Sequence, residues 1–297
     1  MKRALRYLAG FAIGAYYITI GTRKRSLRRY DSENSILSLM THHPTPLVFK
    51  KTIEWLLKEG FHFVSTDDLL NNKIVDLHRK YGRIAWLTID DCWEICKESV
   101  LPMIEKHSIP VTFFLPPTEL ERGILWRHSV WGKTDAETMK RLHFMPSNER
   151  YQKISEILGG MPRERVLMTK EEVVALSSNP LVTFENHTDY HESSVHWSVD
   201  DNLKSIKSAA KKIYEWTGRK TRLMCYPYGY YSDLLDKRIK EETGHLTVTC
   251  NPGVMTEENK FFVRNQIYDD MSFPENSCRI VGAWKKIKSQ KSEQLVV

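Results

Sequence analysis

Two polar clusters in this sequence contain the residue types that bind divalent metals. Asp90 and Asp91 end the apolar run 84–89, and His187 and His191 follow a second apolar run. Each run has the length of a buried strand, so we expect both clusters at strand ends on one mouth of a sheet. One carboxylate and two imidazoles can hold a divalent metal and leave positions open for water and substrate. The second carboxylate is then free to act as a base, which makes the set suited to hydrolysis.

Each cluster taken alone also has a simpler interpretation. Asp90 and Asp91 could cap the N-terminus of a helix, where carboxylates accept hydrogen bonds from free backbone amides. The spacing of His187 and His191 predicts that both rings lie on one side of a helical turn. A zinc-protease motif is excluded, because it requires Glu directly after the first histidine and position 188 is Thr.

A third segment, Cys225-Tyr226-Pro227-Tyr228-Gly229, follows another apolar run. Its Pro and Gly predict a tight turn that presents backbone N–H groups at the same mouth. Backbone donors aimed at a developing oxyanion are what acyl hydrolysis requires. The three segments together therefore favour an acyl hydrolase.

On these motifs the chain resembles the polysaccharide deacetylases with a NodB-homology domain, carbohydrate esterase family four. The first family motif, Thr-Phe-Asp-Asp-Gly, stands here as Thr-Ile-Asp-Asp-Cys at 88–92. The second, His-Ser/Thr-x-x-His, is found at 187–191, and the third, an aromatic turn ending in Pro-Tyr-Gly, at 226–229. The run 109–114 and the spacing between motifs are also similar to the family. The resemblance covers roughly residues 35–270.

The resemblance implies a distorted (β/α) barrel and a metal-dependent hydrolase that acts on carbon–nitrogen bonds other than peptide bonds. It implies a divalent metal, most often Zn²⁺, bound by Asp91, His187 and His191, and Co²⁺, Ni²⁺ or Fe²⁺ suit the same ligands. Asp90 would be the general base that activates the metal-bound water. The backbone amide of Tyr228 would complete the oxyanion hole.

The sequence departs from the family pattern near the expected base. Cys92 occupies a position that is usually Gly in the family. Cys225 occupies the position at which many members have an Arg that stabilises the general base. We predict that Arg264 supplies this charge, and the alternative is a surface arginine after a strand. The late motif with a general-acid histidine is missing, since no histidine follows His245.

A branch of the family that resembles poly-N-acetylglucosamine deacetylases places its acid histidine early, after the first strand. Met40-Thr41-His42-His43 occupies that place in this chain. An imidazole titrates near neutral pH and so suits protonation of a departing amine. We predict that His42 is the acid, with His43 as the second candidate, and the alternative is two surface histidines at a strand end.

The elements that must position these residues alternate between strand and helix. The expected strands are 36–40, 61–65, 84–89, 111–115, 181–185, 222–226, 245–250 and 261–268, and the expected helices are 49–60, a short one capped by Ser65 or Thr66, 95–107, 170–178, 199–217 and 231–243. This alternation predicts an α/β fold with a mostly parallel sheet closed into a barrel. Residues 118–168 do not follow this alternation, and we expect them to form a helical insertion that shapes a rim of the barrel.

The basic excess of the chain is confined to its beginning. The net charge is +7, with 44 Lys and Arg against 37 Asp and Glu, and eight of the basic residues but no acid fall in 1–29. The remaining 36 basic residues balance the acids, so a broad nucleic-acid surface is excluded. We therefore expect a basic, apolar segment at 1–30, a catalytic domain at 31–284 and a basic flexible tail at 285–297.

The uncharged run 7–20 is shorter than the ~20 residues that span a bilayer. Basic residues follow it at once and no small-residue cleavage site intervenes. It is expected to be a helix at a membrane surface, a helix packed on the domain, or a signal or short anchor. A membrane contact through 1–29 would favour the cytoplasmic face, while a secreted or periplasmic location stays open. Five cysteines without a CxxC pair predict no disulfide framework.

The sequence thus leads to three hypotheses for function. The first is removal of N-acetyl groups from an amino sugar in a polysaccharide or a lipid-linked glycan precursor. The second is the same fold acting as an esterase on O-acetyl or other acyl groups of a glycan. The third is a catalytically silent relative that binds carbohydrate.

Overall fold

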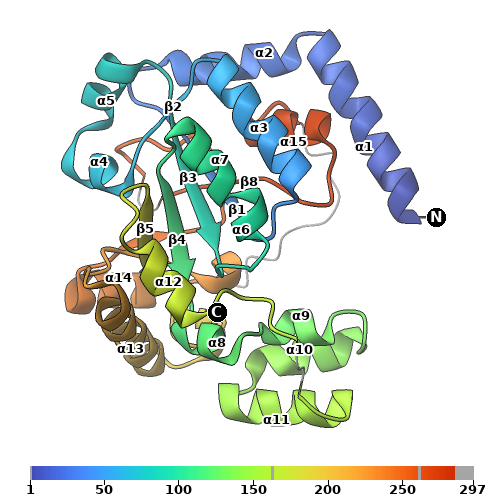
Figure 1. Cartoon of the computed structure of the whole chain (residues 1–297), viewed down its shortest axis with the longest axis vertical. Coiled ribbons are helices and arrows are strands. Elements are labelled where there is room, and N and C mark those ends of the chain that lie inside the picture. Colours follow the sequence, from blue (N-terminus) through green and yellow to red (C-terminus); the bar gives the residue numbers. More distant parts are fainter. Residues whose placement is uncertain (1, 162–163, 260–261, 285–297) are drawn as a thin grey trace. The chain divides into compact units, whose positions relative to one another are not determined.

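Strands β1 (Ile36–Thr41) and β3 (Ile84–Asp90) are buried at every residue, as is typical of inner strands in parallel sheets. The computed structural model describes residues 2–161, 164–259 and 262–284. Within them, eight strands form a sheet in the order β7-β6-β5-β4-β3-β1-β8, with β2 beside β3 (Figure 1). The other strands are β2 (His62–Phe63), β4 (Val111–Leu115), β5 (Val182–Asn186), β6 (Leu223–Cys225), β7 (Leu246–Val248) and β8 (Asn265–Gln266). This curled sheet with surrounding helices confirms the predicted α/β fold, a distorted (β/α) barrel.

The chain divides into two compact units, which we describe separately. The first unit contains 1–89, 95–112 and the residues from 250 onward, and the second contains 90–94 and 113–249. In the first unit β1 pairs in parallel with β3 and β8, and Ile36 stands opposite Ile84. In the second unit β6 pairs in parallel with β5 and β7.

The helices of the first unit follow the predicted positions with four differences. They are α1 (Lys2–Thr19), α2 (Thr22–Leu27), α3 (Pro46–Lys58), α4 (Thr66–Asn71), α5 (Ile74–Tyr81), α6 (Cys96–Ser99), α7 (Leu101–His107) and α15 (Phe273–Ile280). Helices α2, α5 and α15 were not predicted. The helix predicted at 95–107 is split at Val100, because Pro102 has no N–H to donate to the preceding turn.

Helix α1 packs along α15 with one side and leaves the other side exposed. The contact is close because α1 presents Gly10 and Gly14: a Cβ at Gly14 would lie 2.5 Å from the carbonyl carbon of Pro274. On the opposite side Leu5, Leu8 and other apolar residues are exposed. No helix in the described ranges is both long and apolar enough to cross a bilayer.

In the second unit the helices are α8 (Pro117–Arg122), α9 (Trp126–Val130), α10 (Ala136–Phe144), α11 (Ser147–Leu158), α12 (Lys170–Leu176), α13 (Val199–Thr217) and α14 (Asp233–Thr243). Helix α13 packs against β5 and α14. Helices α8 to α11 form the predicted insertion, and Figure 1 shows α9, α10 and α11 (green) gathered together. The apolar cluster of the insertion consists of Ile124, Trp126, Val130, Leu142, Tyr151 and Ile154.

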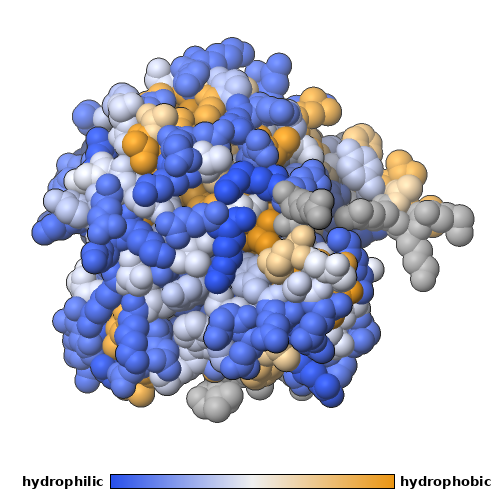
Figure 2. Space-filling view, turned by 60° about the horizontal axis from the view of Figure 1, so that its bottom comes forward, coloured by the Kyte–Doolittle hydropathy of each residue, from blue (hydrophilic) through white to orange (hydrophobic). Residues whose placement is uncertain are grey.

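The surface shown in Figure 2 is largely hydrophilic, and its apolar side chains stand in small separate groups. The tail predicted at 285–297 and position 261 of the last predicted strand lie outside the described residues. The division of the chain at residues 30 and 284 therefore stays a prediction.

Candidate functional site

The first motif forms a turn at the end of β3. Asp90 is the last residue of the strand, and Asp91 and Cys92 then adopt left-handed backbone conformations with φ of 70° and 58°. The next helix, α6, begins at Cys96 with Ile95 as its N-cap. No side chain caps α6, so Asp90 and Asp91 are not the N-cap of the helix that follows them, as the simpler interpretation proposed.

The second motif is a loop after β5 and not a helical turn, so that expectation is also wrong. Thr188 and His191 have positive φ, at 59° and 48°. Side chains take the hydrogen bonds that a helix would make: Asn186 Oδ1 accepts from the Thr188 amide at 2.9 Å, and the Glu192 carboxylate accepts from the Tyr190 amide at 3.1 Å. The Thr188 hydroxyl also bonds to Glu192, at 3.0 Å. These bonds shape the loop so that its two histidines converge.

Asp91, His187 and His191 come together in the second unit. Asp91 Oδ1 lies 3.1 Å from Nε2 of His191 and 3.5 Å from Nε2 of His187. All three side chains are buried, and each can offer one ligand atom within 4.8 Å of the other two. The indole N–H of Trp93 donates to the other oxygen of Asp91 at 3.2 Å, which orients the carboxylate.

Each imidazole has an oxygen partner at Nδ1, the ring nitrogen that does not face Asp91, and this partner orients the ring. Nδ1 of His187 lies 2.9 Å from the carbonyl oxygen of Cys225, which can only accept, so the proton is on Nδ1 and Nε2 presents a lone pair. Nδ1 of His191 lies 3.1 Å from the hydroxyl of Tyr228. Such partners fix the tautomer and ring orientation of metal-ligating histidines.

The electrostatics of this cluster favour a cation. Burial lowers the pKa of His187 to about 4, although Asp90 and Asp91 oppose the shift, so the ring is neutral and able to ligate at neutral pH. Burial also opposes a charge on His191, but Asp91 and Glu119 outweigh it and raise the pKa of His191. The carboxylates thus attract positive charge to this spot, and the donor set of one carboxylate and two imidazoles fits a divalent metal.

Asp90 lies next to the candidate ligands and is completely buried. The Sγ atom of Cys225 is 3.8 Å from Asp90 Oδ2. Asp90, His187 and Cys225 form a second group whose potential ligand atoms lie within 4.8 Å of one another. The thiol therefore contacts the expected base directly.

Tyr228 contacts the site through its side chain, which the sequence did not indicate. It has a φ of 62° in the turn Pro227–Gly229, and its ring lies 4.8 Å from that of His191. On another side the ring of His143 meets it at 4.9 Å, and the guanidinium of Arg127 lies 5.6 Å from its centroid. His143 and Arg127 belong to the helical insertion, and no motif in the sequence points to either residue.

His42 and Arg264 lie in the first unit. His42 is half-buried after β1, and its carbonyl oxygen is 4.0 Å from the Sγ atom of Cys96. His43 is exposed, with Nδ1 3.9 Å from Asp269 Oδ2. The roles predicted for these histidines stay predictions.

Arg264 is fully buried, so the alternative of a surface arginine is wrong. Its guanidinium donates to Thr88 Oγ1 at 2.9 Å and to the Sγ atom of Cys250 at 3.8 Å. A buried arginine requires polar or charged partners. The role predicted for Arg264 beside the base stays a prediction.

Comparisons with known proteins identify the sequence family and the fold. Residues 78–246 match the family model described as polysaccharide deacetylase. The structure is similar to the deacetylase PplD of Streptococcus pyogenes in complex with acetate, with a TM-score of 0.61 at 18% identity over 83% of this chain and 98% of that chain. No curated protein matches the sequence.

Two further solved structures share the fold. IcaB from Ammonifex degensii has a TM-score of 0.61 at 16% identity, over 84% of this chain and 97% of that one. The BpsB deacetylase domain from Bordetella bronchiseptica has a TM-score of 0.55 at 16% identity, over 80% of this chain and 97% of that one. The fold predicted from the motifs is thus found in proteins of very different sequence.

Proposed function

Because the chain belongs to the polysaccharide deacetylase family, we propose that it is a metal-dependent hydrolase that removes N-acetyl groups from an amino sugar of a glycan. The substrate would be a polysaccharide or a lipid-linked glycan precursor. The metal would be Zn²⁺, held by Asp91, His187 and His191.

One observation carries this proposal. The Nε2 atoms of two histidines turn toward a single oxygen of Asp91, while their Nδ1 atoms each face an oxygen partner. Histidines buried only for packing have no need to present two ring nitrogens to one carboxylate oxygen. The arrangement matches the way proteins hold and orient imidazole ligands of a metal.

In the proposed reaction some residues would transfer protons and others would stabilise charge. A bound divalent cation would lower the pKa of water and polarise the acetamide carbonyl. Asp90 would take the proton of the water that adds to the carbonyl carbon, and the backbone N–H of Tyr228 would donate to the oxyanion. The carbon–nitrogen bond then breaks, with His42 giving a proton to the departing amine, and acetate is released. Arg264 would stabilise the charge of Asp90.

Acetate release from N-acetylglucosamine oligomers by the zinc-loaded full chain tests the proposal. Asp90→Asn removes the base, and we expect activity to fall by about 10²–10⁴-fold with the metal retained. His187→Ala should lose the metal, and Asp76→Asn, an exposed change on α5, is the matched control. Release from a chromogenic acetate ester but from no amide would make the protein an esterase. Bound metal without either activity would leave a silent carbohydrate-binding relative.

We also propose that α1 and α2 bring the protein to an anionic membrane surface, on the cytoplasmic face. Leu5, Leu8 and Phe11 are 60%, 62% and 49% exposed on one side of α1, and the surrounding segment 1–29 has no acid. An exposed apolar helix face with nearby cations is typical of interfacial helices. Co-sedimentation of the full chain with anionic vesicles should be lost in the double variant Leu8→Glu and Phe11→Glu. It should be kept in Leu234→Glu, an exposed leucine on α14.

A further inference from the structure

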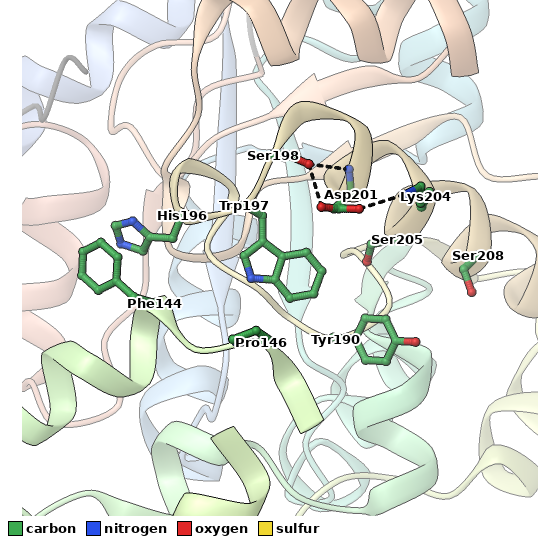
Figure 3. A pocket seen from close by; sticks show the side chains of 10 residues that line it. All are labelled: Phe144, Pro146, Tyr190, His196, Trp197, Ser198, Asp201, Lys204, Ser205 and Ser208. Carbon is green, nitrogen blue, oxygen red and sulfur yellow. Dashed lines mark hydrogen bonds and ion pairs between the residues drawn. The ribbon is translucent and has the colours of Figure 1, made fainter. Parts of the chain in front are cut away.

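The second unit contains a pocket of about 530 Å³ that no motif predicts (Figure 3). Its walls come from the end of α10 and the residues before α11, the stretch 190–198 and the first turns of α13. This volume falls within the ~300–1,000 Å³ of small-molecule sites. The pocket is therefore large enough to be a binding site.

Aromatic rings dominate one side of the pocket. The rings of Tyr190 and Trp197 lie 6.3 Å apart, and those of Phe144 and His196 lie 3.6 Å apart. Figure 3 shows Trp197 and Tyr190 as neighbours on this side, with Pro146 next to Trp197 in the view. None of the four rings is fully buried, although Phe144 and His196 cover one face of each other. A planar apolar surface of this kind suits the C–H face of a sugar ring.

Polar groups lie on the other side. The Asp201 carboxylate accepts a hydrogen bond from the Ser198 hydroxyl at 2.7 Å and pairs with Lys204 at 2.9 Å. These side chains are exposed and offer both a donor and an acceptor to hydroxyl groups of a ligand. Aromatic walls with a few polar groups are the usual composition of a small-molecule site. With a donor and acceptor beside an aromatic face, a pyranose is the ligand class that fits both sides.

The pocket and the candidate metal site share one loop. Tyr190, which lines the pocket, lies between His187 and His191. Two residues of α13 form hydrogen bonds with this loop. Ser205 Oγ accepts from the Asp189 amide at 2.9 Å, and the Ser208 hydroxyl donates to the Asp189 carboxylate at 2.7 Å. The same hydrogen bonds thus position both the candidate ligands and the aromatic wall.

We propose that this pocket is a subsite for a pyranose unit of the glycan other than the unit that is deacetylated. The proposal rests on the proposed function for its substrate class. Phe144 and Pro146 belong to the helical insertion, so the insertion would contribute to the choice of glycan. A glycan that fills the pocket gains contacts that a single sugar at the metal site cannot make.

Calorimetry with N-acetylglucosamine oligomers of one to five units, on the zinc-loaded full chain, tests the subsite. We expect wild-type affinity to rise with oligomer length and Trp197→Ala to weaken pentamer binding by about tenfold. Trp197→Phe should restore most of the affinity, because it keeps an aromatic face. Tyr214→Ala, an exposed tyrosine on α13 outside the pocket, should bind like wild type.

The outcomes separate the subsite from the proposed activity. Pentamer binding that is lost in Trp197→Ala, without acetate release by wild type, keeps the subsite and refutes the deacetylase. If wild type releases acetate and Trp197→Ala has the same pentamer affinity and KM as wild type, the subsite proposal is refuted and the deacetylase proposal stands. A wild type that binds no oligomer also overturns it. Should Trp197→Ala fail to fold, Phe144→Ala gives the same comparison, because Phe144 is half-exposed.

Discussion

The hydroxyl of Tyr228 lies 3.1 Å from Nδ1 of His191, and the ring of Tyr228 also contacts His143 of the helical insertion. A candidate metal ligand is therefore oriented by a tyrosine that packs against the apolar cluster of the insertion. The insertion therefore contacts the residue that orients this candidate ligand.

Tyr228→Phe tests this relationship. The change keeps the ring and the backbone amide and removes only the hydroxyl, so it should lower zinc affinity by about 10–100-fold. Competition against a chelator measures the affinity. Tyr230→Phe, which removes an exposed hydroxyl two residues away, should leave it unchanged. Equal zinc affinity in wild type and Tyr228→Phe would show that the hydroxyl does not orient His191.

His245 is expected to make the protein less stable in mild acid. Burial lowers the pKa of His245 to about 4 from an ordinary value near 6.5, and its two ring nitrogens bond to Thr221 and Thr243 at 2.8 Å. The folded state therefore resists protonation, and the contribution of His245 is complete above pH 6.5 and is lost as the pH falls through 4.

The shift corresponds to at most about 3.5 kcal/mol, at about 1.4 kcal/mol per pH unit. Urea unfolding at a series of pH values measures the free energy of unfolding. His245→Gln should flatten its decline between pH 6.5 and 4, whereas His43→Gln, an exposed histidine, should leave the slope as it is. A parallel decline in wild type and His245→Gln would contradict the prediction.

Gly14 is expected to be needed for the contact of α1 with α15. In Gly14→Val the new Cβ would meet the Pro274 backbone, so α1 should separate from α15. Limited proteolysis would then cleave α1 faster, while the melting temperature of the remaining protein changes little. Ala12→Val, at an exposed position of the same helix, is the control. Unchanged protection of α1 in Gly14→Val would argue against this packing.

Ser65 caps α4 in the way its sequence position predicts. Its hydroxyl accepts from the Asp68 amide at 3.0 Å, and the Asp68 carboxylate accepts from the Ser65 amide at 2.9 Å. Ser65→Ala should lower the free energy of unfolding by about 1 kcal/mol, because it removes the hydroxyl that accepts from the Asp68 amide. Ser178→Ala, an exposed serine after α12, should cost less than half of that. A smaller loss in Ser65→Ala than in the control would refute the capping role.

The sequence predicts elements best where hydrophobic runs and end signals coincide. Strand β4 at 111–115 and helix α13 at 199–217 agree with the prediction residue by residue, because Pro116 follows the first and Ser198 and Gly218 bound the second. Helix α15 is short and has its polar residues Glu275 and Asn276 buried, so its pattern did not stand out.

The site was predictable in its residue types and not in its geometry. Asp91, His187 and His191 lie together as the motifs indicated, but the spacing of the histidines suggested a helical turn that Asn186 and Glu192 prevent by hydrogen bonding to the loop. The contact of Tyr228 with the insertion depends on tertiary packing between distant segments. Sequence patterns carry local periodicity and not such long-range contacts.

Five residues other than glycine adopt left-handed backbone conformations in the three motif loops: Asp91, Cys92, Thr188, His191 and Tyr228. Each such conformation costs about 1–2 kcal/mol relative to the right-handed or extended regions. This cost arises when the chain folds and not when a ligand arrives. The loops are therefore preorganised, and a cation or glycan can bind to them with little loss of backbone entropy.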